Sequence, residues 1–253
     1  MDFDFTGKTA LATGAASGMG LLFCQRFVES GGNALLVDVN EAGLKEKTDA
    51  INREYPGRAD YAVCDVRDYG QVCAARDKAV ARFGSIDVLV NFAGGAELRM
   101  LKVGYAHEFP DVPIEVYDWS LDVNLRGQFY FDHAVMKQMR EQKSGVVVNI
   151  GSITGEEGTA KDVGYSTAKS AAMNGLTRSI AQFGAKYGIR CVCVAPGPVL
   201  TRADMANMKT AEGRAAEPRE IVDLVLYVAS DAGSFFDGVT LLMDGGRSIL
   251  YQK

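Results

Sequence analysis

The stretch Thr13-Gly14-Ala15-Ala16-Ser17-Gly18-Met19-Gly20 decides the fold, because it joins an apolar run to a helical stretch through three glycines. The run Thr9–Thr13 before it is typical of a buried strand, and residues 19–30 after it have helical periodicity. Glycines at such a junction permit a tight turn and let a pyrophosphate approach the backbone N–H groups of the helix N-terminus. A glycine-rich turn with only a structural role is the alternative interpretation.

An acidic residue at the end of the next apolar run favours nucleotide binding over a structural turn. Asp38 follows the run Ala34–Val37 and lies 18 residues after Gly20. A carboxylate at this place accepts hydrogen bonds from both ribose hydroxyls of an adenosine and repels a 2′-phosphate. Neither Ser17 nor Val39 is basic, so these side chains offer no charge to neutralise that phosphate. The pattern therefore predicts that NAD binds in preference to NADP.

Short apolar runs recur along the whole chain and alternate with amphipathic stretches. Most of the runs are continuously apolar, which is typical of strands that helices cover on both faces of a parallel sheet. The runs are Thr9–Thr13, Ala34–Val37, Tyr61–Cys64, Ile86–Asn91, Val146–Ile150, Arg190–Ala195 and Val239–Met243. The amphipathic stretches lie near 19–30, 41–54, 69–83, 116–141, 164–187 and 218–230. This alternation predicts an α/β fold, a doubly wound Rossmann-type parallel sheet of about seven strands with helices on both faces.

The composition is ordinary for a globular protein and excludes several other classes. Of 253 residues, 47% are hydrophobic and 23% are charged, so the chain can build a large core and is not disordered. No linker divides it, and we expect a single domain over residues 1–253. The net charge of −5 gives no electrostatic reason for a nucleic-acid or membrane partner. The start of the chain has no basic region of a secretory signal, and no apolar run approaches the roughly 20 residues that span a bilayer.

The five cysteines are an odd number and favour free thiols in a reducing compartment, so we expect a cytoplasmic protein. Cys191 and Cys193 lie on a predicted buried strand, and no second ligand pair or nearby histidine accompanies them. Their spacing therefore does not indicate a metal site, and we expect none.

A tyrosine and a lysine four residues apart suggest acid–base chemistry. Tyr165 and Lys169 share one face of the predicted helix, where Cβ atoms lie about 6 Å apart. A nearby ammonium stabilises the phenolate and makes the tyrosine a usable proton donor and acceptor near neutral pH. Ser152 follows the predicted strand Val146–Ile150, and its hydroxyl could hold a substrate oxygen beside Tyr165. Alone, the Tyr-x-x-x-Lys spacing is a weak signal, because any surface helix can contain it.

Together these motifs resemble the short-chain dehydrogenase/reductase family over essentially the whole chain. Each fragment is modestly specific, but their shared order and spacing are strongly specific. The fragments are Thr13-Gly14-x-x-x-Gly18-x-Gly20, Asp65-Val66, Asn91-Phe92-Ala93-Gly94, Asn124-Leu125-x-Gly127, Ser152, Tyr165-x-x-x-Lys169, Pro196-Gly197-x-x-x-Thr201 and Asp244-Gly245-Gly246.

The resemblance implies a catalytic tetrad and an NAD site. Tyr165 would exchange a proton with a substrate oxygen that Ser152 orients. Lys169 would bind the nicotinamide ribose and stabilise the tyrosinate, and Asn124 would hold a water in the proton relay. The implied cofactor-binding residues are Gly14, Ser17, Gly18, Met19, Gly20, Asp38, the adenine pair Asp65 and Val66, the floor residues Asn91, Ala93 and Gly94, then Tyr165, Lys169, Pro196 and Gly197, and finally Val199 and Thr201 at the carboxamide.

Three features depart from the family pattern. Phe92 stands where a second asparagine is usual, and we expect a packing change there. The segment 94–117 is longer than usual and the segment 201–218 is shorter, which affects the substrate rather than the reaction. The remaining conspicuous side chains are interpreted as surface, core or subunit-interface residues: His107, His133, Trp119, Phe129, Tyr130 and Phe131.

The resemblance implies an NAD-dependent oxidoreductase that interconverts a secondary alcohol and a ketone, as a homotetramer or homodimer. The alternatives are a reductase of 3-oxoacyl-carrier-protein type, a steroid dehydrogenase and a non-catalytic NAD-sensing regulator. A nucleotide-sugar epimerase would have another glycine spacing and a longer C-terminal domain. Regulators of this kind can lose catalytic groups, whereas this chain has all four.

The resemblance implies that the loops after Gly94 and after Ser152 lie beside the reacting carbon, and their polar residues suggest a small polar substrate such as a sugar, polyol or hydroxy acid. An apolar ligand would leave their hydrogen-bonding groups unpaired. Equally, these charges could simply face solvent. The residues are Glu97, Arg99 and Lys102 in one loop, and Thr154, Glu156, Glu157, Thr159, Lys161 and Asp162 in the other. Arg99 or Lys102 could pair with a substrate carboxylate.

Overall fold

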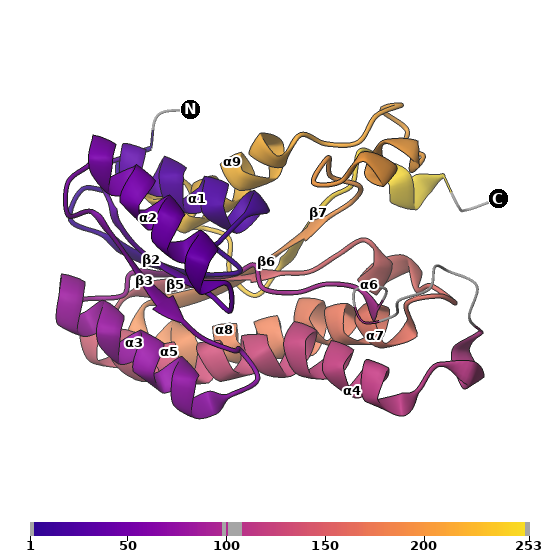
Figure 1. Ribbon diagram of the computed structural model, residues 1–253, viewed down its shortest axis with the longest axis horizontal. Coiled ribbons are helices and arrows are strands. Elements are labelled where there is room, and N and C mark those ends of the chain that lie inside the picture. The colour runs from indigo at the N-terminus through magenta and orange to yellow at the C-terminus, as the bar shows by residue number, and fades with distance from the viewer. Residues whose placement is uncertain (1–2, 98–99, 101–107, 251–253) are drawn as a thin grey trace.

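The computed structural model describes residues 3–97, 100 and 108–250 (Figure 1). In these residues the strands form one seven-stranded sheet in the order β3-β2-β1-β4-β5-β6-β7. All neighbouring strands are parallel. The strands are β1 (Thr9–Thr13), β2 (Asn33–Asp38), β3 (Ala59–Val63), β4 (Val88–Asn91), β5 (Gly145–Ile150), β6 (Ile189–Pro196) and β7 (Thr240–Met243). The predicted doubly wound α/β fold is confirmed, and every predicted strand is present.

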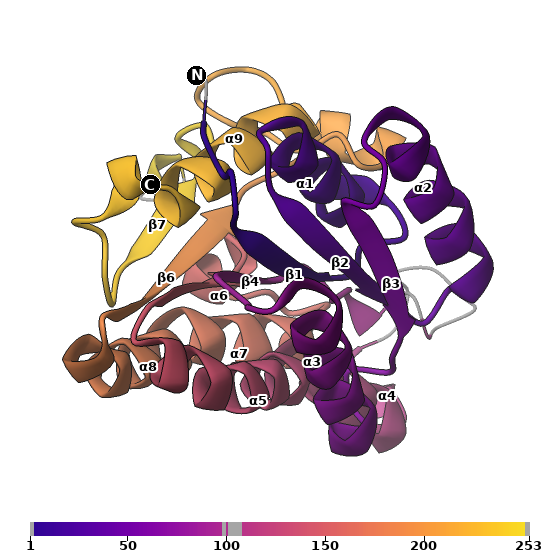
Figure 2. The same cartoon turned by 90° about the vertical axis from the view of Figure 1, so that its left-hand side faces the viewer.

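Helices cover both faces of the sheet. Helices α1 (Gly18–Glu29), α2 (Glu41–Glu54) and α9 (Pro218–Ala229) lie on one face. Helices α3 (Tyr69–Phe83), α5 (Gly127–Gln142) and α8 (Thr177–Gly184) lie on the other (Figures 1 and 2). The strand order reverses between β1 and β4, because β1 pairs with β2 on one side and with β4 on the other. Ligands of open α/β sheets bind at the carboxyl ends of the strands at such a reversal.

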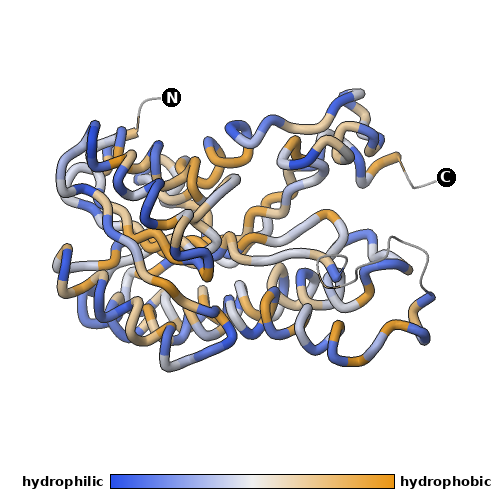
Figure 3. The backbone as a smooth tube through the Cα atoms, in the orientation of Figure 1, coloured by the Kyte–Doolittle hydropathy of each residue, from blue (hydrophilic) through white to orange (hydrophobic). Residues whose placement is uncertain are grey.

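The core consists of two apolar layers, one on each face of the sheet. Successive side chains of a strand point to opposite faces and so belong to different layers. Ala10 and Ala12 of β1 belong to the layer under α1, α2 and α9, whereas Leu11 belongs to the layer over α3, α5 and α8. All five residues of β1 are buried, because helices cover both faces. In Figure 3 apolar residues run through the middle of the molecule, and many hydrophilic residues lie on the outer helices.

Two long amphipathic stretches are interrupted by π-helical turns. The first runs from α4 (Ile114–Leu121) through a π-helical turn at Asp122–Arg126 into α5. The second runs from α7 (Val163–Ala171) through a turn at Ala172–Leu176 into α8. A π-helical turn inserts one residue into the helix and changes the face that later residues present. A short helix, α6 (Thr154–Glu157), follows β5 and was not predicted.

Within the described residues, each helix is too short or too polar to cross a lipid bilayer. All five cysteines, at positions 24, 64, 73, 191 and 193, have free thiols. Burial raises the pKa of Cys24, Cys191 and Cys193, so these thiols behave as small apolar core residues.

Candidate active site

A cleft of about 700 Å³ lies at the carboxyl ends of the strands. Its walls come from the turns after β1 to β6 and from the N-terminal part of α7. Seventeen of the predicted site residues line it, and only Asn91 and Asn124 do not. Those that line it are Gly14, Ser17, Gly18, Met19, Gly20, Asp38, Asp65, Val66, Ala93, Gly94, Ser152, Tyr165, Lys169, Pro196, Gly197, Val199 and Thr201.

The glycine-rich turn has the shape that a phosphate cradle needs. Gly14 has a φ of +66°, and a Cβ there would lie 2.9 Å from the backbone nitrogen of Ala93. A Cβ on Gly20 would lie 2.5 Å from the carbonyl oxygen of Gly14, so the turn and helix α1 can approach only without side chains. Helix α1 has no acidic residue in its first turn, and its N-cap Ser17 makes no side-chain capping bond. The N-terminal amides and the helix dipole therefore face the cleft without a competing carboxylate.

Asp38 ends β2 and is fixed in orientation by the backbone. Its Oδ2 accepts from the Ala16 N–H at 3.2 Å and its Oδ1 accepts from the Asn40 N–H at 3.0 Å. The first bond ties the carboxylate to the glycine-rich turn itself. A carboxylate in this place can accept further bonds from ribose hydroxyls.

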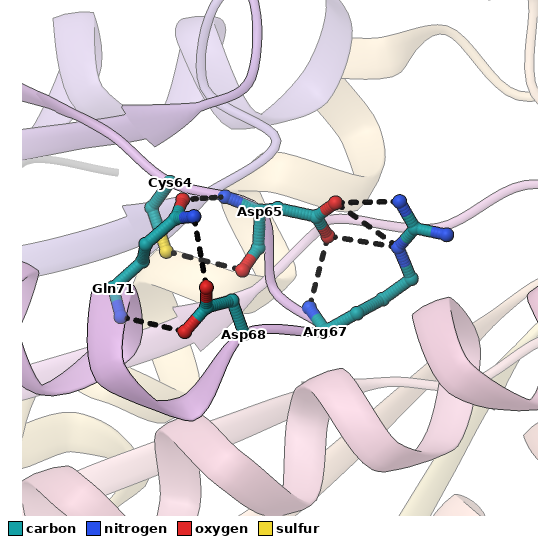
Figure 4. Close-up of polar contacts among 5 residues, drawn as sticks. All are labelled: Cys64, Asp65, Arg67, Asp68 and Gln71. Atoms are coloured by element: carbon teal, nitrogen blue, oxygen red, sulfur yellow. Dashed lines mark hydrogen bonds and ion pairs between the residues drawn. The ribbon is translucent and has the colours of Figure 1, made fainter.

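The pair Asp65 and Val66 lies after β3, where Arg67 holds the Asp65 carboxylate (Figure 4). Arg67 Nη2 lies 2.6 Å from Asp65 Oδ2 and Arg67 Nε lies 3.0 Å from Oδ1. Hydrogen bonding to Arg67 lowers the pKa of Asp65. Gln71 accepts from the Asp65 N–H at 2.9 Å and is itself held by Asp68, the N-cap of α3. Arg67 also lines the cleft, and the motif analysis missed it because the family pattern ends at Val66.

Asn91, which was predicted to belong to the cofactor site, does not itself line the cleft. It is 1% exposed, and its Nδ2 donates to Asp132 Oδ1 and to Asn149 Oδ1, each at 2.8 Å. Asn149 in turn donates to Asp132 Oδ2 at 3.1 Å. Burial raises the pKa of Asp132 to about 7 despite these two amide donors. Asn91 thus supports the floor from beneath, while Ala93, held by Thr13 Oγ1 at 3.0 Å, forms the surface.

Lys169 lies on the floor of the cleft beside Tyr165. It is 2% exposed, and its Nζ donates to the Ile150 carbonyl oxygen at 2.7 Å. Burial lowers the pKa of Lys169 to about 8. Its Nζ lies 5.6 Å from the centre of the Tyr165 ring. Ser152 Oγ accepts a hydrogen bond from Thr154 Oγ1 at 3.0 Å. The predicted catalytic residues Ser152, Tyr165 and Lys169 therefore all line the same cleft.

Asn124 lies in the first π-helical turn and is fully buried. Its Nδ2 donates to the carbonyl oxygens of Gly95 and Ser120 at 2.9 and 2.8 Å, and its Oδ1 accepts from the Gly95 N–H at 2.9 Å. A Cβ on Gly94 would lie 2.6 Å from Asn124 Oδ1, so any other residue there would displace the Asn124 side chain. The Asn124 side chain therefore fixes the loop after β4, and a relay water would have to share its polar atoms.

The turn after β6 closes the cleft on the other side. Gly197 packs against the residue that follows β7, since a Cβ there would lie 2.6 Å from the Cα of Asp244. The Thr201 N–H donates to the Val199 carbonyl oxygen at 2.6 Å. This turn places Thr201 at the cleft.

Several residues that line the cleft were not predicted to do so. Trp119 was interpreted as a core or interface residue, but it is half-buried and lines the cleft. Phe92 packs on Phe23 with ring centres 5.7 Å apart, which is the expected packing change. The others include Ile153, Arg202, Met205 and Met208, which lie in the loops after β5 and β6.

The polar loop residues have different positions. Thr154 and Asp162 line the cleft, whereas Glu97 is buried at 1% exposure. Glu157 is bonded to Arg247 at 3.2 Å. Arg99, Lys102 and His107 lie outside the described residues. His133 is bonded to the Tyr69 hydroxyl at 2.6 Å, Phe131 is buried and Phe129 is half exposed. No group of three or more potential metal ligands occurs within residues 3–97, 100 and 108–250.

The chain is similar to known proteins of one family. Residues 8–212 match the family described as short chain dehydrogenase. A 3-alpha-(or 20-beta)-hydroxysteroid dehydrogenase of Mycobacterium tuberculosis is 38% identical over 95% of this chain and 89% of that protein. A D-threitol dehydrogenase of Mycolicibacterium smegmatis is 33% identical over 98% and 96%. The crystal structure of a 3-oxoacyl-[acyl-carrier protein] reductase with bound NAD from Brucella melitensis superposes with a TM-score of 0.86 at 31% identity, covering 95% and 91%.

Proposed function

Since the chain belongs to the short-chain dehydrogenase/reductase family, we propose that it is an NAD-dependent oxidoreductase that interconverts a secondary alcohol and a ketone. One observation carries the proposal: Ser152, Tyr165 and Lys169 border the same cleft as the glycine-rich turn and Asp38. The residues fit a dinucleotide, because the turn leaves room for a pyrophosphate and Asp38 offers acceptors to the adenosine ribose.

The residues divide the work as follows. NAD(H) supplies or accepts the hydride when bound. Tyr165 exchanges a proton with the substrate oxygen, and Ser152 orients that oxygen by hydrogen bonding. The Lys169 ammonium, 5.6 Å from the Tyr165 ring centre, stabilises the tyrosinate and binds the nicotinamide ribose. Asn124 holds the loop after β4 and is proposed to contact the relay water.

Asp38 is proposed to select NAD(H) over NADP(H). The ionised carboxylate would lie beside the 2′-phosphate of NADP(H), and both its oxygens are already fixed by backbone N–H groups, so it cannot turn away without breaking them. We expect the wild type to be at least about tenfold more efficient with NAD(H), equivalent to about 1.4 kcal/mol. Asp38→Ala should reduce this ratio, whereas Asp49→Ala, a carboxylate on the surface of α2, should not. Wild-type efficiency that is equal or higher with NADP(H) would disprove the selection.

A small polar substrate, such as a sugar, polyol or hydroxy acid, is proposed. Asp162 and Arg202 both line the cleft near Ser152 and Tyr165, and charged groups of both signs suit a ligand with several polar groups. A second candidate is an apolar secondary alcohol such as a steroid, because Trp119 and two methionines of the loop after β6 also line the cleft. Comparing kcat/KM for polyols and hydroxy acids with that for steroids and acyl thioesters decides between them.

We also propose a single-domain cytoplasmic enzyme that forms a homotetramer or homodimer. Two exposed aromatic residues support an interface: Phe129 on α5 is 50% exposed and Phe183 on α8 is 42% exposed. Light scattering after size-exclusion chromatography gives the oligomeric state. A monomer at micromolar concentration would contradict this part of the proposal.

A further inference from the structure

A buried carboxylate reaches the helix that carries Tyr165 from a different part of the chain. Glu97 follows β4, is 1% exposed, and accepts a hydrogen bond at its Oε1 from the Tyr165 backbone N–H at 2.6 Å. Gly164 leaves the room for this contact, since a Cβ there would lie 2.6 Å from the same oxygen. The two residues are 68 positions apart in the sequence. The contact therefore depends on the tertiary fold.

This bond replaces the ordinary cap of the helix. Helix α7 begins at Val163, so Tyr165 is its third residue, where an N-cap side chain normally accepts the backbone N–H. Asp162 is the N-cap residue but makes no capping bond with its side chain. Glu97 thus caps the helix in its place and also puts negative charge at the positive end of the helix dipole. Fixing the third residue of α7 fixes the backbone from which the Tyr165 ring projects.

The Glu97 carboxyl also interacts with the side chain of Asp162. Glu97 Oε2 and Asp162 Oδ1 are both buried and have no donor among the described residues. A hydrogen bond between the two carboxyls requires a proton on one of them, and burial with the facing Glu97 charge raises the pKa of Asp162 to about 6. A single proton between the carboxyls would satisfy both oxygens, whereas two ionised groups would repel each other without a donor.

We infer that Glu97 is a positioning residue for Tyr165, and that it holds this place by sharing one proton with Asp162. The inference rests on the proposed function, because Tyr165 is the proton-transfer group of that reaction. The shared proton allows Glu97 to cap the helix while Asp162 stays on the cleft wall.

Other charged and titratable groups face this pair. Arg202 after β6 and Lys161 before α7 favour the ionised Asp162, and both act against the shared proton. Tyr117 of α4 also lies near the pair, and burial followed by the charges of Glu97 and Asp162 raises the pKa of its phenol. Burial and the Glu97 carboxyl outweigh these two cations, so the pKa of Asp162 is raised to about 6.

Two substitutions of Glu97 with similar size separate positioning from simple packing. Glu97→Leu removes the acceptor, whereas Glu97→Gln keeps a carbonyl for the Tyr165 N–H and turns its amide towards Asp162 as a permanent donor. We expect Glu97→Leu to lower kcat at least tenfold while the dissociation constant of NADH changes less than threefold, and we expect Glu97→Gln to retain kcat within threefold. Equal kcat for Glu97→Leu and the wild type, or equal losses in both variants, would overturn the positioning role.

Hydrogen exchange tests the cap without any substrate. By mass spectrometry, the peptide that contains residues 163–171 should exchange at least tenfold faster in Glu97→Leu than in Glu97→Gln, while peptides from α2 exchange alike. Unchanged exchange would overturn the inference even if the enzyme turns over alcohols. Conversely, faster exchange in a protein that oxidises no alcohol with NAD would refute the proposed function and leave the cap established.

The shared proton is tested with Asp162→Asn, whose amide donates to Glu97 at every pH. The ratio of wild-type to Asp162→Asn kcat should change at least threefold between pH 5 and 8, with a midpoint near 6. Asp118→Asn, on the exposed face of α4, should give a ratio that does not depend on pH. A constant ratio for Asp162→Asn would overturn proton sharing.

Discussion

Replacing Lys169 by methionine should make the cofactor-free protein more stable at pH 7, although it should abolish turnover. The lysine is 2% exposed, and its pKa falls from the ordinary 10.5 to about 8 because burial disfavours the ammonium. At pH 7 the side chain is charged in both the folded and the unfolded chain. The gap between the two pKa values therefore measures the cost of burying the charge, which is about 3 kcal/mol.

Part of this cost is recovered through one hydrogen bond. Nζ donates to the Ile150 carbonyl oxygen, and losing that bond offsets about 1 kcal/mol of the gain. The carbonyl is not left unpaired in the variant, because Gln128 Nε2 also donates to it at 3.2 Å. Methionine has a similar length and fills the space with apolar atoms. The expected net increase in the free energy of unfolding is about 2 kcal/mol at pH 7.

The sign of the pH dependence makes the test specific. A lysine with a lowered folded pKa binds fewer protons in the folded chain than in the unfolded chain between pH 8 and 10.5, so wild-type stability rises with pH in this window. The advantage of Lys169→Met should therefore shrink by about 2 kcal/mol between pH 7 and 9.5. Urea unfolding of the cofactor-free proteins, followed by circular dichroism, measures both values. Lys137→Met on the exposed surface of α5 is the control. A variant less stable than the wild type at pH 7, or an advantage independent of pH, would refute the reasoning.

Two further predictions concern Tyr165 and Asp132. Tyr165→Phe removes the transferable proton and keeps the ring, so turnover should fall by about 10²–10⁴-fold while the NADH dissociation constant stays within twofold; near-normal turnover in a coupled absorbance assay would contradict the acid–base role. Burial raises the pKa of Asp132 to about 7, so the folded chain keeps this proton at pH values where the unfolded chain has lost it. Wild-type stability should therefore fall by about 3 kcal/mol between pH 4 and 7. Asp132→Asn should lack this fall in urea titrations, and equal slopes for the two proteins would show that Asp132 is not the group concerned.

The sheet could be predicted from the sequence because its strands are buried on both faces. A continuous apolar run such as Leu35–Val37 has only one stable place in a globular chain of this size, between two helical layers. The glycine-rich turn could be predicted for a related reason. Gly14 and Gly20 meet backbone atoms where any Cβ would clash, so the residue type itself reports the geometry.

Residues whose role depends on a distant partner could not be predicted in this way. Asn91 pairs in register with Asn149 across β4 and β5, and both point to Asp132, 41 residues away from Asn91. The face that Asp132 presents depends on the π-helical turn at Asp122–Arg126, which periodicity does not reveal. Glu97 is similar: its sequence neighbours are those of an exposed loop, but the fold buries it at 1% exposure beneath α7.

The groups that best suit catalysis are thus also the ones that burial penalises. Lys169 has a lowered pKa and Asp162 a raised pKa, each mainly because burial disfavours its charged form. Both residues line the cleft. In the cofactor-free protein the Lys169 ammonium donates to a neutral acceptor, the Ile150 carbonyl oxygen. A negatively charged dinucleotide bound in the cleft would attract this buried ammonium. Binding to the folded state alone stabilises it by mass action, so cofactor should raise the stability of the wild type more than that of Lys169→Met. The cost of the buried lysine is therefore expected to be largest in the free protein and smallest in the complex that performs the reaction.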